Sequence, residues 1–286
     1  MSQTRTRVAQ AAASAPGSTR GRARGIPPLR RWSQAEVLLA GLLLALAGAG
    51  WLVSDLLATS DMRTGVLTGA QPMGASMRPW LVEGGLFFLT WMVMMAAMML
   101  PSIVPFTVGM TRLMRGSGAA EGSTITMTSA YLLLWAATGV LAYPALKGLQ
   151  MLSGQPTELA VRAGAVILLA AGAYQFSPLK RVCLRHCRSP LILIMQHGQR
   201  ATRNRRGALR AGLEHGVYCL GCCWALLVVL LAAGAMSLVW MGAVAAVVAV
   251  EKVSSRGEAI ATALGAVLIA AGLVLLAAPG LLATPS

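Results

Sequence analysis

Residues 213–233 read LEHGVYCLGCCWALLVVLLAA, and this stretch decides the fold. Its length matches the roughly 20 residues with which a helix crosses a bilayer, and within this stretch no charged side chain follows His215. Six further apolar runs lie along the chain, at about 37–58, 81–103, 128–148, 159–176, 236–252 and 259–280. We therefore expect an all-α, polytopic transmembrane bundle of about seven spans, in which the sixth is the shortest.

The composition supports a membrane protein. Hydrophobic residues make up 56% of the chain and charged residues only 12%, against about 25% charged residues in soluble domains. The net charge of +15 comes from clusters beside apolar runs, with seven arginines in the first 31 residues and nine basic residues from Lys180 to Arg210. Such flanks favour contact with anionic lipid headgroups and disfavour nucleic acid as a partner.

The basic clusters also predict the domain organisation and the orientation. Residues 1–35 are expected to form a disordered, basic cytoplasmic tail, followed by a single transmembrane domain over 36–282. Its one sizeable connection, 177–212, carries cysteine and histidine and is basic, so we expect it in the cytoplasm. With seven spans the N-terminus lies inside and the C-terminus outside. The pair Arg30-Arg31 also fits a twin-arginine export signal, but the long apolar run after it favours an uncleaved first span.

Five cysteines fall into two groups that each contain a histidine. On a helix, the spacing within each group places its members on one face. The first group is Cys183, His186 and Cys187, and the second is His215, Cys219, Cys222 and Cys223. Because both groups are expected at the cytoplasmic side, we predict that they meet and form a metal site. The reducing cytosol disfavours a structural disulfide.

Three residues on other spans are further candidate ligands. Met95 and Met98 share a helical face in the methionine-rich run 91–102. Thioethers bind Cu(I) well and Zn(II) poorly, so they favour copper first and zinc second, although methionine is also common packing material. Glu251 closes the sixth predicted span, as a ligand, a partner of a histidine, or an ion pair with Lys252.

Three functions remain open from the residues alone. The first is metal handling (transport, delivery or sensing) without catalysis, in exchange with a metal donor or acceptor protein or a membrane complex. The second is a membrane thiol–disulfide redox protein that uses Cys219 and Cys222, whose spacing suits a dithiol. The third is a structural or assembly role without metal. The sequence contains no phosphate-binding glycine loop, no zinc-protease helix and no nucleophile elbow.

Four motifs, in order, carry a resemblance to a known family. They are residues 91–102 (WMVMMAAMMLPS), 174–190 (YQFSPLKRVCLRHCRSP), 212–224 (GLEHGVYCLGCCW) and the pair Glu251-Lys252. Over residues 35–255 the chain resembles the bacterial family described as predicted metal-binding integral membrane proteins, a domain of unknown function. The resemblance implies a multi-pass protein of the bacterial inner membrane with a metal site. It also marks Gln175 and Lys180, together with the five cysteines, His215, Glu251 and Lys252.

Overall fold

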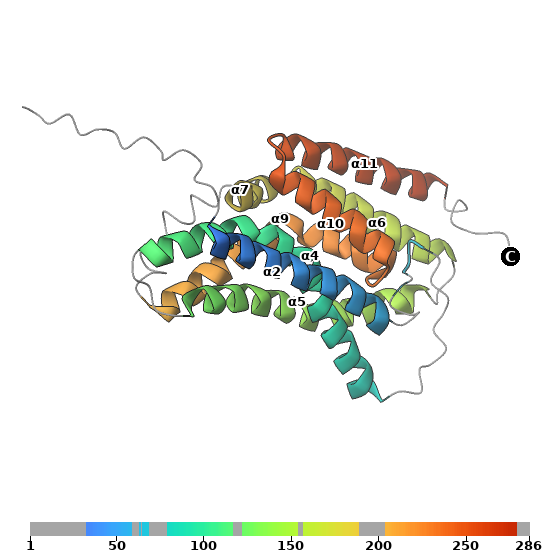
Figure 1. The fold of residues 1–286 in the computed structure, drawn as a ribbon. Coiled ribbons are helices and arrows are strands. Elements are labelled where there is room, and N and C mark those ends of the chain that lie inside the picture. The colour runs from blue at the N-terminus through green and yellow to red at the C-terminus, as the bar shows by residue number, and fades with distance from the viewer. Residues whose placement is uncertain are drawn as a thin grey trace, which may run out of the picture. The chain divides into compact units, whose positions relative to one another are not determined.

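The computed structural model describes residues 33–58, 63, 65–68, 79–116, 122–153, 157–188 and 204–278. These residues form eight α-helices and no strand (Figure 1), which confirms the all-α expectation for this part of the chain. The helices are α2 (Gln34–Leu57), α4 (Trp80–Gly116), α5 (Ser123–Ser153), α6 (Thr157–Gln175), α7 (Pro178–Arg188), α9 (Arg205–Gly234), α10 (Leu238–Val253) and α11 (Gly257–Ala277).

The chain divides into two compact units, Met1–Val37 and Leu38–Ser286. In the first unit only residues 33–37 are described, so most of the predicted 1–35 tail lies outside the described residues. There Ser33 and Glu36 form a capping box at the start of α2. The Glu36 amide donates to Ser33 Oγ at 3.4 Å and the Ser33 amide donates to Glu36 Oε2 at 2.9 Å. The second unit holds the rest of the fold.

Five helices are long and apolar enough to cross a membrane: α2, α4 (over Leu81–Met114), α5, α9 and α11. The pair α6 and α7 counts as a sixth span if the two helices, which meet at a 63° bend, are taken as one broken span. Helix α10 has 16 residues, fewer than the roughly 20 of a full span. A membrane protein is therefore supported, whereas the seventh span and the orientation stay predictions.

The bend between α6 and α7 follows from Ser177 and Pro178. Pro178 has no amide hydrogen, which suits the first position of a helix. Ser177 acts as the cap of α7, since its Oγ accepts a hydrogen bond from the Lys180 amide at 3.1 Å. Helix α7 thus begins at Pro178, and residues 189–203 of the predicted 177–212 connection lie outside the described residues.

Helix α9 packs closely against α5, and α6 against α11. At Gly212 the backbones of α9 and α5 nearly touch, because a Cβ there would lie only 2.1 Å from the Met127 carbonyl oxygen. Such close approach is how membrane helices pack through small residues. Gly234 has φ of +114°, which lets the chain turn sharply from α9 into α10.

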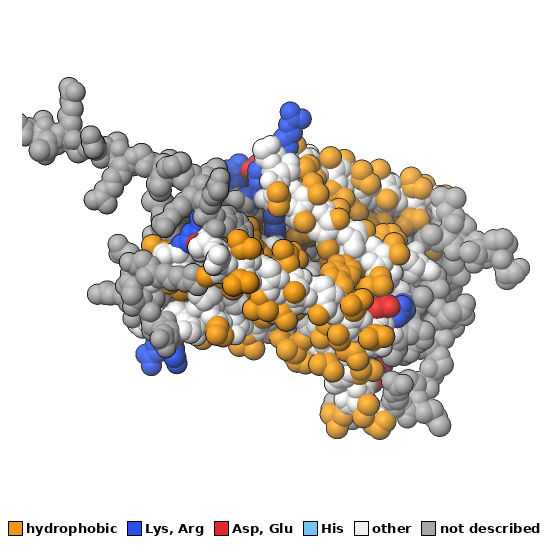
Figure 2. All heavy atoms as spheres, in the orientation of Figure 1, with side chains coloured by type: hydrophobic (Ala, Val, Ile, Leu, Met, Phe, Trp, Pro, Cys, Tyr) orange, Lys and Arg blue, Asp and Glu red, His pale blue; other side chains and the backbone are white. Residues whose placement is uncertain are grey.

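The interior of the second unit is rich in aromatic and methionine side chains. Trp91, Tyr131, Trp135, Met94 and Met95 are all at most 2% exposed. The outer face carries exposed leucine and valine side chains, and Figure 2 shows hydrophobic side chains spread over α2, α10 and α11 with the Lys and Arg side chains away from this band. A surface of this kind suits lipid rather than water.

Candidate metal site

The two cysteine groups lie together, because α7 packs across α9. Cys187 on α7 lines the same cavity as Lys252, whose Nζ lies 3.0 Å from the Cys219 Sγ on α9. One turn earlier on α7, Cys183 fits against Gly221, where an added Cβ would lie 2.6 Å from the Cys183 Sγ. Gly221 therefore gives the space that lets the sulfur-bearing face of α7 approach α9.

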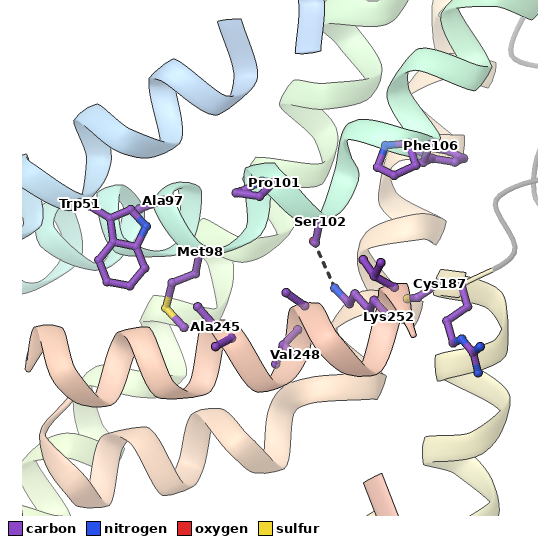
Figure 3. Close-up of a pocket in the computed structure, with 15 residues that line it drawn as sticks. Trp51, Ala97, Met98, Pro101, Ser102, Phe106, Cys187, Ala245, Val248 and Lys252 are labelled. Carbon is purple, nitrogen blue, oxygen red and sulfur yellow. Dashed lines mark hydrogen bonds between the residues drawn. The ribbon is translucent and has the colours of Figure 1, made fainter. Parts of the chain in front are cut away.

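Cys219 stands at the centre of a polar cluster formed by four helices. Lys252 Nζ of α10 donates to Ser102 Oγ of α4 at 3.1 Å (Figure 3). It also donates to Cys219 Sγ at 3.0 Å. Tyr131 of α5 forms a hydrogen bond with the same sulfur at 3.2 Å. A lysine ammonium can only donate, so the Cys219 sulfur acts as its acceptor. This arrangement stabilises negative charge on that sulfur.

Cys222 and Cys223 are buried next to Cys219 and turned towards its backbone. Each thiol donates to the Cys219 carbonyl oxygen at 3.0 Å, and all five cysteines are free thiols. Among the residues that the structure describes, no three His, Cys, Asp or Glu side chains are arranged to hold a metal ion together. Thiols are weak hydrogen-bond donors, so a change of side-chain rotamer would release them from the carbonyl. The sulfur donors are of the soft type that selects Cu(I).

The two candidate histidines lie apart from the thiol cluster. His186 stacks on Tyr218, with ring centroids 4.3 Å apart, and its Nδ1 lies 2.8 Å from the Val182 carbonyl oxygen. His215 is buried and stacks parallel on Phe106 at 4.2 Å. Within the described part of the chain, the Nδ1 of His215 has no hydrogen-bond partner.

Of the two candidate methionines, only Met98 faces the region of the thiols. It lines a cavity of roughly 570 Å³ to which Cys187 and Lys252 also contribute (Figure 3). Met95 is 1% exposed and packs in the hydrophobic core. Both sulfurs belong to α4, but they face different surroundings.

Glu251 forms an ion pair with Lys180 rather than with its neighbour Lys252. The Lys180 Nζ to Glu251 Oε2 distance is 2.7 Å, and both side chains are 1% exposed. This buried pair connects α7 to α10 and so holds the helix that carries Cys187. We call it the α7–α10 clamp.

The sequence reasoning missed Tyr131, and it marked Lys180 only through the family resemblance, not as the partner of Glu251. A signal for Lys180 was present, because it shares a helical face with the buried residues Cys183 and Leu184 of α7. A lysine on a buried face needs a partner of opposite charge. Tyr131 had no such signal, since only the packing of α5 against α9 brings it to Cys219.

A family model described as PpoB2, copper chaperone, matches residues 88–275, which is more than half of the chain. The match begins within α4 and extends into α11, so it starts and ends later than the 35–255 resemblance. No curated protein and no solved structure matches the chain.

Proposed function

The chain belongs to the PpoB2 family of copper chaperones, and from this membership we propose that it binds Cu(I) inside a membrane bundle and delivers it to another protein. The observation that supports the proposal is the packing of α7 on α9, which brings Cys187 to the cavity where Lys252 donates a hydrogen bond to Cys219. Residues 32 or more positions apart in the sequence thus supply soft ligands to one place.

The proposed ligands are the sulfurs of Cys187, Cys219 and Cys222. The neighbouring Cys223 is an alternative ligand. Thiolates suit both Cu(I) and Zn(II), but Zn(II) prefers four ligands in a tetrahedral shell. The family membership favours copper over zinc. Cys183 and His215 adjoin the site and would join it only after movement, whereas His186 is turned towards Tyr218.

Lys252 and Tyr131 support the charge of the site. Cu(I) held by two thiolates carries a net negative charge, which is costly in an apolar interior unless it is balanced. The Lys252 ammonium, 3.0 Å from the Cys219 sulfur, supplies this balance. We therefore assign to Lys252 the role of charge partner rather than ligand.

We further propose that the protein has seven spans in a bacterial inner membrane, with its N-terminus inside. Helix α10 would serve as the short sixth span, and α6 with the bent α7 as the fourth. The basic residues of α7 and of the first turn of α9 would then face the cytoplasm. The copper site would lie at the cytoplasmic side, where metal donors carry reduced thiols.

The family membership favours copper delivery over the two alternatives, a dithiol redox protein and a structural partner without metal. Transport and sensing of the metal remain finer alternatives to delivery. A thiol–disulfide function would require a reversible Cys219–Cys222 disulfide in cells, which thiol trapping measures.

The direct test is copper content. Purified protein, loaded with Cu(I) under reducing conditions and freed from excess metal, is expected to retain copper. The variant Cys219→Ser/Cys222→Ser is expected to retain none above background. The matched control is Met95→Leu, whose side chain packs in the hydrophobic core and is not among the proposed ligands. If the wild-type protein retains no copper, the proposal is wrong.

A further inference from the structure

The cavity beside the thiol cluster has apolar walls and a polar, positively charged end. It lies between α2, α4, α7 and α10 and measures roughly 570 Å³. Trp51 and Met98 line one end, and Pro101 and Val248 line the middle (Figure 3). At the other end are Ser102, Cys187, Arg188 and Lys252.

Cys187 is the thiol that a ligand in this cavity meets first. It is only partly buried and lines the cavity, whereas Cys219, Cys222 and Cys223 are at most 1% exposed. Cys183 is also buried, at 6%. Because Lys252 lines the same cavity and donates to the Cys219 Sγ, the cavity leads from Cys187 towards the buried thiols.

The charges beside Cys187 are positive. Arg188 and Lys252 both line the cavity, and none of the described lining residues is acidic. Of the neighbouring carboxylates, Glu251 pairs with Lys180 and Glu258 with Arg185, each at 2.7 Å, and Glu258 also interacts with the charge of Arg188. A bare Cu⁺ or Zn²⁺ ion is repelled by such an entrance, whereas an anion is attracted.

We propose that this cavity accepts copper as an anionic Cu(I)–thiolate complex, and that Cys187 is the sulfur that takes the metal from its carrier. The inference rests on the proposed function, in which the thiol cluster binds Cu(I). A carrier that holds Cu(I) through two thiolates has the negative charge that Arg188 and Lys252 attract. The carrier is a small acidic thiol or the paired cysteines of a donor protein, which share this chemistry.

The transfer is a ligand exchange without electron transfer. A bond forms between copper and the Cys187 sulfur while one copper–sulfur bond to the carrier breaks. The proton of the Cys187 thiol passes to the carrier sulfur that leaves, and copper remains Cu(I) throughout. A second exchange of the same kind, with Cys219 or Cys222, frees the carrier and moves the metal into the buried cluster.

The test compares rates of copper uptake from two probes of opposite charge. Full-length reduced protein in detergent is mixed with Cu(I)–glutathione, which is anionic, or with Cu(I)–acetonitrile, which is cationic. The copper–thiolate absorbance is followed in time. We expect Arg188→Gln to slow uptake from the glutathione complex about 3- to 10-fold at low salt, with no slowing for the acetonitrile complex.

Two variants sharpen the test. Arg185→Gln is the matched control, because Arg185 is on the same helix but is exposed and paired with Glu258. It is expected to leave both rates unchanged. Cys187→Ser is expected to slow uptake from Cu(I)–glutathione by at least about 10-fold. A third probe, Cu(I) bound to an acidic peptide with two cysteines, distinguishes the two carriers. If the carrier is a small thiol, copper uptake is fast from Cu(I)–glutathione and slow from the peptide. If the carrier is a donor protein, uptake from the peptide is fast as well.

The possible failures are distinct. If Arg188→Gln takes copper from Cu(I)–glutathione as fast as the wild-type protein does, and both reach the same final copper content, this inference is wrong while the proposed function stands. If the wild-type protein takes up no copper from any probe, the proposed function itself is wrong.

Discussion

Two sulfur-rich regions of this bundle contain similar atoms in different surroundings. In α4, Met94, Met95 and Met99 are buried in a hydrophobic core beside aromatic rings. In α7 and α9, the cysteines adjoin polar groups, and Cys219 accepts hydrogen bonds from Lys252 and interacts with Tyr131. Buried polar groups are costly unless they serve each other or a ligand. The groups that surround each sulfur atom, more than the number of sulfur atoms, distinguish a packing region from a metal-binding region.

The difference also explains why one region is preformed and the other is not. The methionine side chains fill space, so their positions are fixed by close packing. Cys222 and Cys223 are held only by weak hydrogen bonds to the Cys219 carbonyl oxygen. A chaperone that must both take and release its metal benefits from ligands that exchange easily.

The largest expected difference is between substitutions in the cysteine region, which affect copper binding, and substitutions in the methionine region, which affect stability. Cys219→Ser/Cys222→Ser should lose copper binding entirely but change thermal stability less, because the serine hydroxyl can still accept the hydrogen bond from Lys252. Met94→Ala and Met95→Ala should each cost about 2–5 kcal/mol of stability, because they open cavities in the core, while folded protein still binds copper. Copper content and thermal unfolding in detergent measure both. Equal copper loss in the methionine and cysteine variants would contradict the distinction.

The α7–α10 clamp is the next target, since it holds Cys187 in place. Glu251→Gln leaves the buried Lys180 ammonium without its ion-pair partner and should cost about 3–5 kcal/mol, measured by thermal unfolding. It should also lower copper affinity.

A double variant gives the control for the clamp. Lys180→Met/Glu251→Leu removes both charges, so its stability should return to near that of the wild-type protein. If the double variant is as unstable as Glu251→Gln, the loss of stability comes from changed side-chain packing rather than from the unpaired charge.

Lys252 should have an intermediate effect, on affinity rather than stability. Lys252→Gln removes the charge partner of Cys219 and should weaken Cu(I) binding about 10- to 100-fold, as changes around metal ligands do. Competition with a Cu(I) chelator measures this. Lys147→Gln, whose lysine pairs with Glu83 instead, is the control. An unchanged affinity in Lys252→Gln would remove the charge-balance argument.

The sequence predicted the helical class well, because long apolar runs have few structural solutions in a membrane. The start of α7 at Pro178 and the turn at Gly234 also have local causes, because proline fixes φ and suits a helix start, whereas glycine tolerates a positive φ. The number of spans was less certain, since the 16 residues of α10 fall between a full span and a shorter buried helix.

The site was predictable in its residue types but not in its partners. Spacing indicated that Cys219, Cys222 and Cys223 share a face, but not that their thiols turn towards the backbone. The pairing of Glu251 with Lys180 instead of Lys252 depends on how α7 crosses α10. Such contacts depend on how distant helices pack, and the spacing of residues along one helix does not indicate this packing.

The smallest expected effect separates the two candidate methionines. Met98→Leu removes the thioether that lines the cavity, whereas Met95→Leu changes a packing residue. Both substitutions nearly conserve volume and should cost less than about 1.5 kcal/mol of stability. If Met98 assists copper on its way to Cys187, its variant alone takes up Cu(I) more slowly, by roughly 2- to 5-fold, as expected for loss of one weak contact of about 0.5–1 kcal/mol. Equal uptake rates in the two variants would place Met98 with the packing methionines and leave the cysteines as the sole sulfur ligands of the site.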